Sequence, residues 1–78
     1  MKIQVKYPKL PTKILTLIVE MNDIKYYFAI SEYDYHMFFG KKQEKQLYEL
    51  ICNNSSKSTF ATIDNPFVIY IIDGKIME

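Results

Sequence analysis

The sequence contains no tryptophan and no arginine, and it has only one cysteine and two glycines in 78 residues. Arginine is the side chain that reads guanine edges and grips phosphates with paired hydrogen bonds. Its absence, together with a net charge of +1, argues against a dedicated DNA-binding protein, so we expect no direct contact with nucleic acid. The single cysteine, Cys52, cannot form an internal disulfide, which is typical of proteins in the reducing cytoplasm.

Long apolar runs and clusters of reactive side chains are also missing. The longest purely apolar run, Phe67 to Ile72, is far shorter than the roughly 20 residues of a membrane span, so we expect no membrane contact. His36 is the only histidine and follows Asp34 by two positions, which on a helix directs the two side chains nearly oppositely. We therefore expect no enzymatic activity, no metal site and no cofactor.

Aromatic residues, in contrast, are concentrated in the middle of the chain. Of seven tyrosines and five phenylalanines, most lie within residues 26–39, namely Tyr26, Tyr27, Phe28, Tyr33, Tyr35, Phe38 and Phe39. Aromatic side chains offer a large rigid contact area and dominate binding energy where they stay exposed. A single domain spanning residues 1–78 has a limited core in which to bury them. The sequence therefore indicates a binding protein.

Alternating apolar residues predict a small antiparallel sheet. A possible short edge strand, Lys2 to Lys6, comes before a kink at Pro8 and Pro11. The main strands are expected at Ile14–Met21, Ile24–Ile30, Thr59–Ile63 and Phe67–Ile72. Asn22-Asp23 and Asp73-Gly74 are tight-turn dipeptides, and the second leads to a stub strand at Lys75–Glu78.

Between the strands, the pattern changes to the helical period. Ser31 and Asp34 fit a capping box, in which each side chain satisfies a backbone amide of the first turn. Two apolar stripes follow, the first formed by Tyr35, Phe38 and Phe39 and the second by Leu47, Leu50 and Ile51. At about 100° per residue these stripes lie roughly 120° apart, so one straight helix cannot bury both against one surface.

Gly40 is the natural point for a break between these stripes. We expect a short aromatic helix before it and a second helix from about Lys42 to Cys52, with Cys52 buried as a small apolar side chain. The predicted fold class is α+β, in the order strand, strand, helix, strand, strand. Its antiparallel sheet carries one helical layer that is broken near Gly40.

The middle of the chain, about residues 15–51, resembles a known protein family. The residues that carry the resemblance are Lys25, Tyr26, Tyr27, Asp34, Tyr35, Phe39, Gly40, Leu47 and Leu50. In this order and spacing they resemble the very small uracil-DNA glycosylase inhibitors of Bacillus phages. Members of that family are strongly acidic, whereas this chain is close to neutral.

The resemblance implies a homodimer that mimics DNA. It also implies that Tyr35 and Phe39 form a hydrophobic box around the apolar side chain that the glycosylase wedges into the duplex. Acidic residues would then stand in for phosphates; these are Glu20, Asp23, Glu32 and Asp34. The chain would accordingly be an inhibitor from a phage or mobile element that occludes the DNA-binding cleft of host uracil-DNA glycosylase in the host cytoplasm.

The expected partner-binding residues are Tyr27, Tyr35, Phe38, Phe39, Glu20, Asp23, Glu32 and Asp34. Other interpretations of the same residues stay open. The patch could inhibit a different nucleic-acid enzyme, as anti-CRISPR and antirestriction proteins do. A stripe such as Tyr35, Phe38 and Phe39 is also typical of a buried core, or of a homodimer seam in a structural, oligomerising protein.

Overall fold

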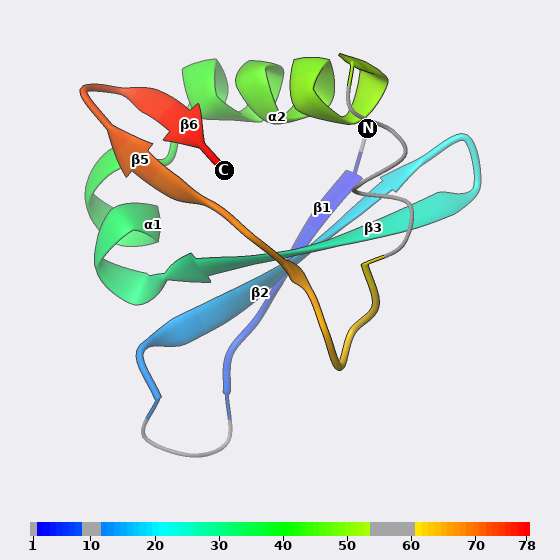
Figure 1. The fold of residues 1–78 in the computed structure, drawn as a ribbon, viewed down its shortest axis with the longest axis horizontal. Coiled ribbons are helices and arrows are strands. Elements are labelled where there is room, and N and C mark those ends of the chain that lie inside the picture. Colours follow the sequence, from blue (N-terminus) through cyan, green and yellow to red (C-terminus); the bar gives the residue numbers. More distant parts are fainter. Residues whose placement is uncertain (1, 9–11, 54–60) are drawn as a thin grey trace.

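In the computed structural model, which describes residues 2–8, 12–53 and 61–78, a four-stranded sheet carries helices on one face (Figure 1). The elements are β1 (Lys2–Lys6), β2 (Ile14–Met21), β3 (Ile24–Ser31), α1 (Glu32–Phe38), α2 (Lys41–Asn53), β4 (Phe67–Val68), β5 (Tyr70–Ile72) and β6 (Lys75–Met77). The sheet has the order β1-β2-β3-β4, and β5 with β6 forms a separate hairpin. The fold is α+β, as the sequence predicts.

The sheet is mixed, although the sequence pattern predicts a wholly antiparallel one. Strands β1, β2 and β3 pair antiparallel, but β4 pairs parallel with β3 through Phe28 with Phe67 and Ala29 with Val68. The cause is the connection, because the chain passes through two helices between β3 and β4. Such a crossover returns the chain in its original direction, whereas a tight turn reverses it.

The β2–β3 hairpin supplies most of the core face. Its turn residues Asn22 and Asp23 both have positive φ, 52° and 65°, which is the conformation that suits the twist of a two-residue hairpin loop. The register places three buried side chains of β2 beside three of β3; these are Leu15, Leu17 and Val19 next to Ile30, Phe28 and Tyr26. The prediction of a central strand over residues 14–21 is confirmed.

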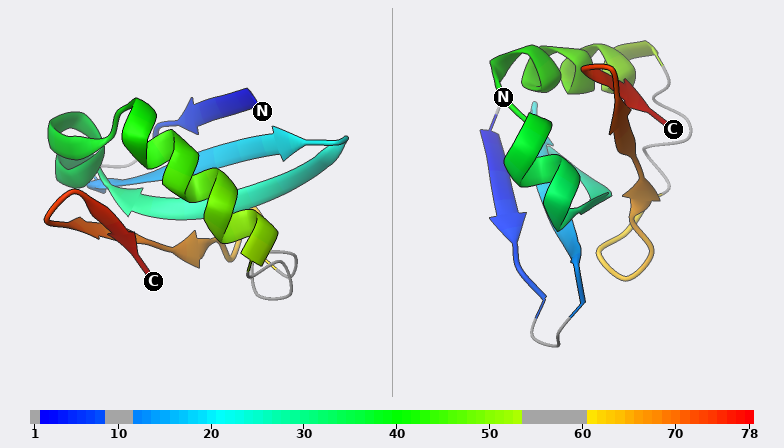
Figure 2. Two further views of the ribbon diagram at one scale, coloured as in Figure 1. Left: turned by 90° about the horizontal axis from the view of Figure 1, so that it is seen from above. Right: turned by 90° about the vertical axis from the view of Figure 1, so that its left-hand side faces the viewer.

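Helix α2 covers this apolar face, as the two views in Figure 2 show. Its buried side chains Leu47 and Ile51 belong to the core, together with Ile69 and Ile71 from the C-terminal segment. The opposite face of the sheet carries residues of the other parity, among them Ile18 and Tyr27. Both are partly exposed.

The expected helix break near Gly40 is confirmed, but glycine's conformational freedom does not cause it. Helix α1 ends at Phe38, and Phe39 is extended, with φ −82° and ψ 118°. Helix α2 then starts at Lys41, where the Gln43 Oε1 atom accepts a hydrogen bond of 3.0 Å from the backbone N–H of Gly40. A methyl group on Gly40 would meet that oxygen at 3.7 Å, an ordinary contact. The extended Phe39 and the glutamine cap therefore account for the break.

The C-terminal strands depart from the prediction. Residues 59 and 60 of the expected strand Thr59–Ile63 lie outside the described residues, and residues 61–63 form no strand. The expected strand Phe67–Ile72 is interrupted at Ile69, whose N–H donates to the carbonyl of Ala29 at 2.9 Å. The segment before Ile69 joins the main sheet and the segment after it joins β6. The turn at Asp73-Gly74 and the stub strand β6 are confirmed.

Two glutamines of α2 hold the C-terminal hairpin. Gln43, only 6% exposed, donates from Nε2 to the carbonyl of Gly74 at 2.9 Å. Gln46 donates to the same carbonyl at 3.2 Å and accepts from the N–H of Ile76 at 3.0 Å. A buried backbone group without a partner is costly, so these bonds fix where the hairpin lies on α2.

We predict that Gln43→Met lowers the free energy of unfolding by about 1–3 kcal/mol, although methionine preserves side-chain length and helix propensity. The substitution removes a partner from the N–H of Gly40 and from the carbonyl of Gly74. Urea unfolding measures the change, and Lys45→Met, at an exposed position of the same helix, is the control. Equal stability of both variants would show that the glutamine bonds are dispensable.

Candidate functional site

Helix α1 is bonded to neighbouring segments at its start and is closed by a capping hydrogen bond at its end. At its start, Ser31 Oγ accepts from the N–H of Asp34 at 3.0 Å, and the N–H of Glu32 donates to the carbonyl of Lys13 at 2.7 Å. At its end, the N–H of Phe39 donates to the carbonyl of Tyr35 at 3.2 Å. Yet no residue of the helix itself is buried. The helix is therefore fixed in position while much of its surface faces solvent.

Tyr35 and Phe39 attach α1 to the core. Both are partly buried and pack against the core, and their rings stack with centroids 5.3 Å apart and an interplanar angle of 27°. Rings stacked this closely leave no room for a third side chain between them. Burial raises the pKa of the Tyr35 hydroxyl, and the nearby Tyr7 and Glu44 raise it further, so Tyr35 is neutral at physiological pH.

The apolar side chains that α1 exposes are Tyr33, Met37 and Phe38, which we call the α1 patch. They are 65%, 61% and 44% exposed. Tyr33 and Phe38 contact each other edge to face, with ring centroids 5.8 Å apart. Large apolar side chains grouped on a surface are disfavoured in water by about 25 cal/mol per Å² and are typical of interaction sites.

Asp34 connects α1 to β5. The sequence suggests that its carboxylate reaches back to Ser31, but its Oδ2 atom instead accepts from the N–H of Ile71 at 3.1 Å. Phe38 lies one helical turn after Asp34 and therefore on the same side of α1, the side toward β5. The outward side chains of β5, Tyr70 and Ile72, are exposed as well. The α1 patch therefore borders a second group of exposed apolar residues.

An apolar groove of about 300 Å³ lies beside this border. It is lined by Ile14, Ala29, Ile30, Ser31, Asp34, Val68, Ile69 and Tyr70. This volume is at the lower limit for small-molecule sites, and aliphatic side chains form most of the walls. The groove is therefore suited to one or two apolar side chains of a partner.

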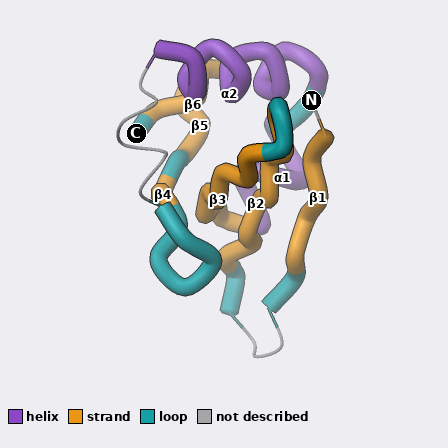
Figure 3. Tube along the Cα trace, turned by 90° about the vertical axis from the view of Figure 1, so that its right-hand side faces the viewer, coloured by secondary structure: helices purple, strands orange, loops and turns teal. Residues whose placement is uncertain are grey.

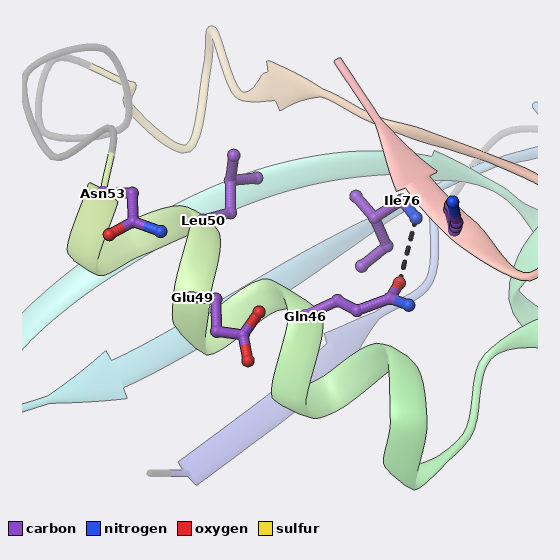
Figure 4. Close-up of a pocket in the computed structure, with 6 residues that line it drawn as sticks. Gln46, Glu49, Leu50, Asn53 and Ile76 are labelled. Atoms are coloured by element: carbon purple, nitrogen blue, oxygen red, sulfur yellow. Dashed lines mark hydrogen bonds between the residues drawn. The ribbon is translucent and has the colours of Figure 1, made fainter.

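A second hollow, of about 330 Å³, lies between α2 and β6 (Figure 4). Its lining residues are Gln46, Glu49, Leu50, Asn53, Lys75 and Ile76. Figure 4 shows the Gln46 side chain directed at the N–H of Ile76, to which it is hydrogen-bonded. Because that polar group already serves the fold, this hollow is a weaker candidate than the groove beside α1.

The four acidic residues expected to imitate phosphates are not brought together. Glu20 and Asp23 lie at one end of the β2–β3 hairpin, and Glu32 and Asp34 lie beyond the far end of β3, which spans roughly 25 Å. Glu20 is also the register partner of Lys2 on β1 and of Lys25 on β3. Asp34 accepts a hydrogen bond from the N–H of Ile71. These carboxylates do not form a row along one surface.

The aromatic residues expected to bind a partner differ in their exposure and position in the structure. Phe38 is exposed, Tyr35 and Phe39 are partly buried, and Tyr27 lies apart from them on the outer face of the sheet. Tyr33 and Met37 were not among the expected partner-binding residues. Their spacing of four positions, on the side of the helix opposite Tyr35 and Phe39, is the signal that identifies them.

The remaining polar residues of this region have modest contacts. The His36 Nε2 atom lies 3.9 Å from Glu32 Oε1, and the His36 ring stacks with Tyr7, with ring centroids 6.3 Å apart.

Within the described residues no group of three or more His, Cys, Asp or Glu side chains is placed to hold a metal ion. No helix there has the length and apolar character to cross a membrane. Cys52 is exposed, so the expectation of a buried thiol is wrong.

Comparison with protein-family models, with curated proteins and with solved structures finds no match to this chain. The assignment of a function therefore depends on the geometry of the site.

We predict that Asp34→Ala lowers the free energy of unfolding by about 1–3 kcal/mol, because it removes a charge-assisted hydrogen bond to the N–H of Ile71. Glu32→Ala is the matched control, since it removes an exposed carboxylate from the same first helical turn and should cost less than about 1 kcal/mol. Thermal and urea unfolding of both variants measure the difference. An equal loss of unfolding free energy in the two variants would mean that Asp34 stabilises the fold only through the helix dipole.

Proposed function

We propose that the protein is a non-enzymatic binding protein that uses the α1 patch and the adjacent groove to bind a partner protein. The observation that carries this proposal is that the aromatic side chains of one short helix have two different roles. Tyr35 and Phe39 attach the helix, while Tyr33, Met37 and Phe38 remain exposed beside an apolar groove. The fold gains little from the exposed three, so a contact with a partner explains them best.

The attachment of α1 also favours binding energetically. A helix bonded to the sheet at its start and packed through a ring stack at its end is already ordered before a partner arrives. Association then costs less conformational entropy than it would with a flexible segment. Tyrosine and phenylalanine side chains held in this way are the usual centre of a binding hot spot.

The first target to test is uracil-DNA glycosylase, which the resemblance to the phage inhibitors implies. In this proposal the α1 patch contacts the apolar side chain that the enzyme inserts into DNA, and the body of the protein blocks the DNA-binding cleft in the host cytoplasm. The role expected for Tyr35 and Phe39 changes accordingly. They position the patch, and occlusion of the cleft contributes more than phosphate mimicry because the acidic residues are dispersed.

The same surface serves a second target class equally well, namely another nucleic-acid enzyme of the kind that anti-CRISPR or antirestriction proteins inhibit. Affinity capture on the immobilised protein, compared with capture on the Phe38→Ala variant, identifies such a target. A partner retained by the wild-type protein alone is one that needs the α1 patch.

We predict that Phe38→Ala and Tyr33→Ala each weaken inhibition of the glycosylase about 30-fold or more, the loss expected from a hot-spot residue. Both side chains are exposed, so stability should change by less than about 1 kcal/mol. A uracil-excision assay with purified enzyme, run beside thermal melts, measures both quantities. Tyr48→Ala is the control, because Tyr48 is a similarly exposed aromatic residue on α2.

Two results would contradict this proposal in different ways. Wild-type protein that leaves excision unaffected at large excess removes the glycosylase as the target, while affinity capture still tests the patch. Loss of about 3–5 kcal/mol of stability in Phe38→Ala, the cost of truncating a buried phenylalanine, would instead make the α1 patch part of the core.

We also propose that the protein forms the homodimer that the resemblance implies, because its exposed apolar residues extend from the α1 patch to Tyr70 and Ile72. Sedimentation equilibrium should then show a dimer at micromolar concentration that dissociates on dilution, and Ile72→Asp should give a monomer. A wild-type monomer at all concentrations would leave these residues for the partner protein alone.

A further inference from the structure

The outer edge of β1 is a second surface that the fold leaves open. Among the described residues β1 pairs only with β2, and Figure 3 shows it as the outermost strand of the sheet. In such an edge strand every second residue directs its N–H and C=O away from the sheet. These backbone groups can hydrogen-bond to one additional extended chain.

The side chains of β1 define what such a chain must look like. Ile3 and Val5 are partly buried against the core, on the face that α2 covers, and Lys2, Gln4 and Lys6 are exposed on the opposite face. A strand added along this edge would place alternate side chains on the two faces. It would need apolar side chains next to Ile3 and Val5 and polar side chains next to the lysines.

A second copy of the protein does not satisfy these requirements. If two β1 strands paired antiparallel about Gln4, Lys2 of each copy would face Lys6 of the other. Like charges directly opposite each other destabilise a strand pair. The lysines of this edge therefore oppose self-association while they attract a chain of opposite charge.

The charge balance of the edge favours an acidic chain in particular. Lys2 already has Glu20 as its register partner on β2, but Lys6 lies opposite the uncharged Thr16. The ammonium group of Lys6 thus has no acidic side chain in its cross-strand position. We propose that the β1 edge binds an extended segment of a partner protein in which acidic and apolar residues alternate. This site is separate from the α1 patch and does not depend on the function proposed for it.

The test uses two short fluorescent peptides with blocked ends, one alternating glutamate with valine and one alternating lysine with valine. The glutamate peptide should bind saturably, at least about tenfold more tightly than the lysine peptide, as measured by fluorescence anisotropy. Methylation of alternate backbone nitrogens on its hydrogen-bonding edge should abolish binding, because the ladder bonds are then lost. Absence of saturable binding, or equal binding of the methylated peptide, would overturn the proposal.

Variants of the protein locate the site. The double change Lys2→Glu and Lys6→Glu should reverse the preference toward the lysine peptide, whereas Lys41→Glu with Lys45→Glu on α2 should leave it unchanged. Lys6→Gln is a milder variant that should weaken binding of the glutamate peptide without altering the fold, which circular dichroism verifies. A reversed preference in the α2 variant, or no change in the β1 variants, would place the peptide elsewhere and refute the proposal. Phe38→Ala should bind the glutamate peptide normally, which separates this result from the outcome for the α1 patch.

Discussion

The apolar face of the β2–β3 hairpin is the constraint on which the remaining structure depends. Three side chains of β2 and three of β3 are directed to one side, and a domain this small has few elements with which to cover them. Helix α2 covers part of this face through Leu47 and Ile51, and the C-terminal segment adds Ile69 and Ile71. That segment is held by hydrogen bonds as well as by packing. Its backbone is bonded to polar side chains of both helices, namely Asp34, Gln43 and Gln46.

This arrangement explains why α1 keeps an exposed apolar surface. Once α2 and the C-terminal segment cover the sheet, Tyr35 and Phe39 are enough to pack α1 against the core, and hydrogen bonds of Ser31, Glu32 and Asp34 hold the helix in position. Tyr33, Met37 and Phe38 are then left exposed, with Tyr33 and Phe38 in contact with each other. An inhibitor or other binding protein gains from such a helix, because the sheet orders the aromatic side chains before the partner is met.

Local periodicity was enough to predict the elements that form between residues close together in the sequence. The β2–β3 hairpin, its Asn22-Asp23 turn, the two helices and the Asp73-Gly74 turn all depend on spacing within a few residues. The split of the C-terminal strand at Ile69 could not be predicted in this way. It depends on a bond to the carbonyl of Ala29, forty positions earlier in the chain. The parallel direction of β4 similarly follows from the long connection and not from its own residues.

The candidate site was only partly predictable for a similar reason. The sequence located the aromatic helix, yet the same spacing rule allows either side of that helix to face the core. The fold selects one side: Tyr35 and Phe39 pack against the core, the bond from Ile71 to Asp34 holds the Asp34 side toward β5, and Tyr33 and Met37 stay exposed. Asp34 therefore has a role in the fold that its position after Ser31 did not reveal. Gln43 and Gln46 were overlooked because a glutamine on an amphipathic helix is usually taken for a solvent-facing residue.

The ring stack between Tyr7 and His36 relates the two proposed surfaces to each other. Tyr7 directly follows β1, and His36 belongs to α1, so the stack places the end of β1 beside the aromatic helix. A partner segment running along β1 would therefore end next to α1. One partner protein could contact the strand edge with an extended acidic segment and the α1 patch with an apolar side chain. The binding free energies of two modest contacts on one rigid domain would then add, because the translational and rotational entropy of association is lost only once. A fold of this size could reach a useful affinity in this way.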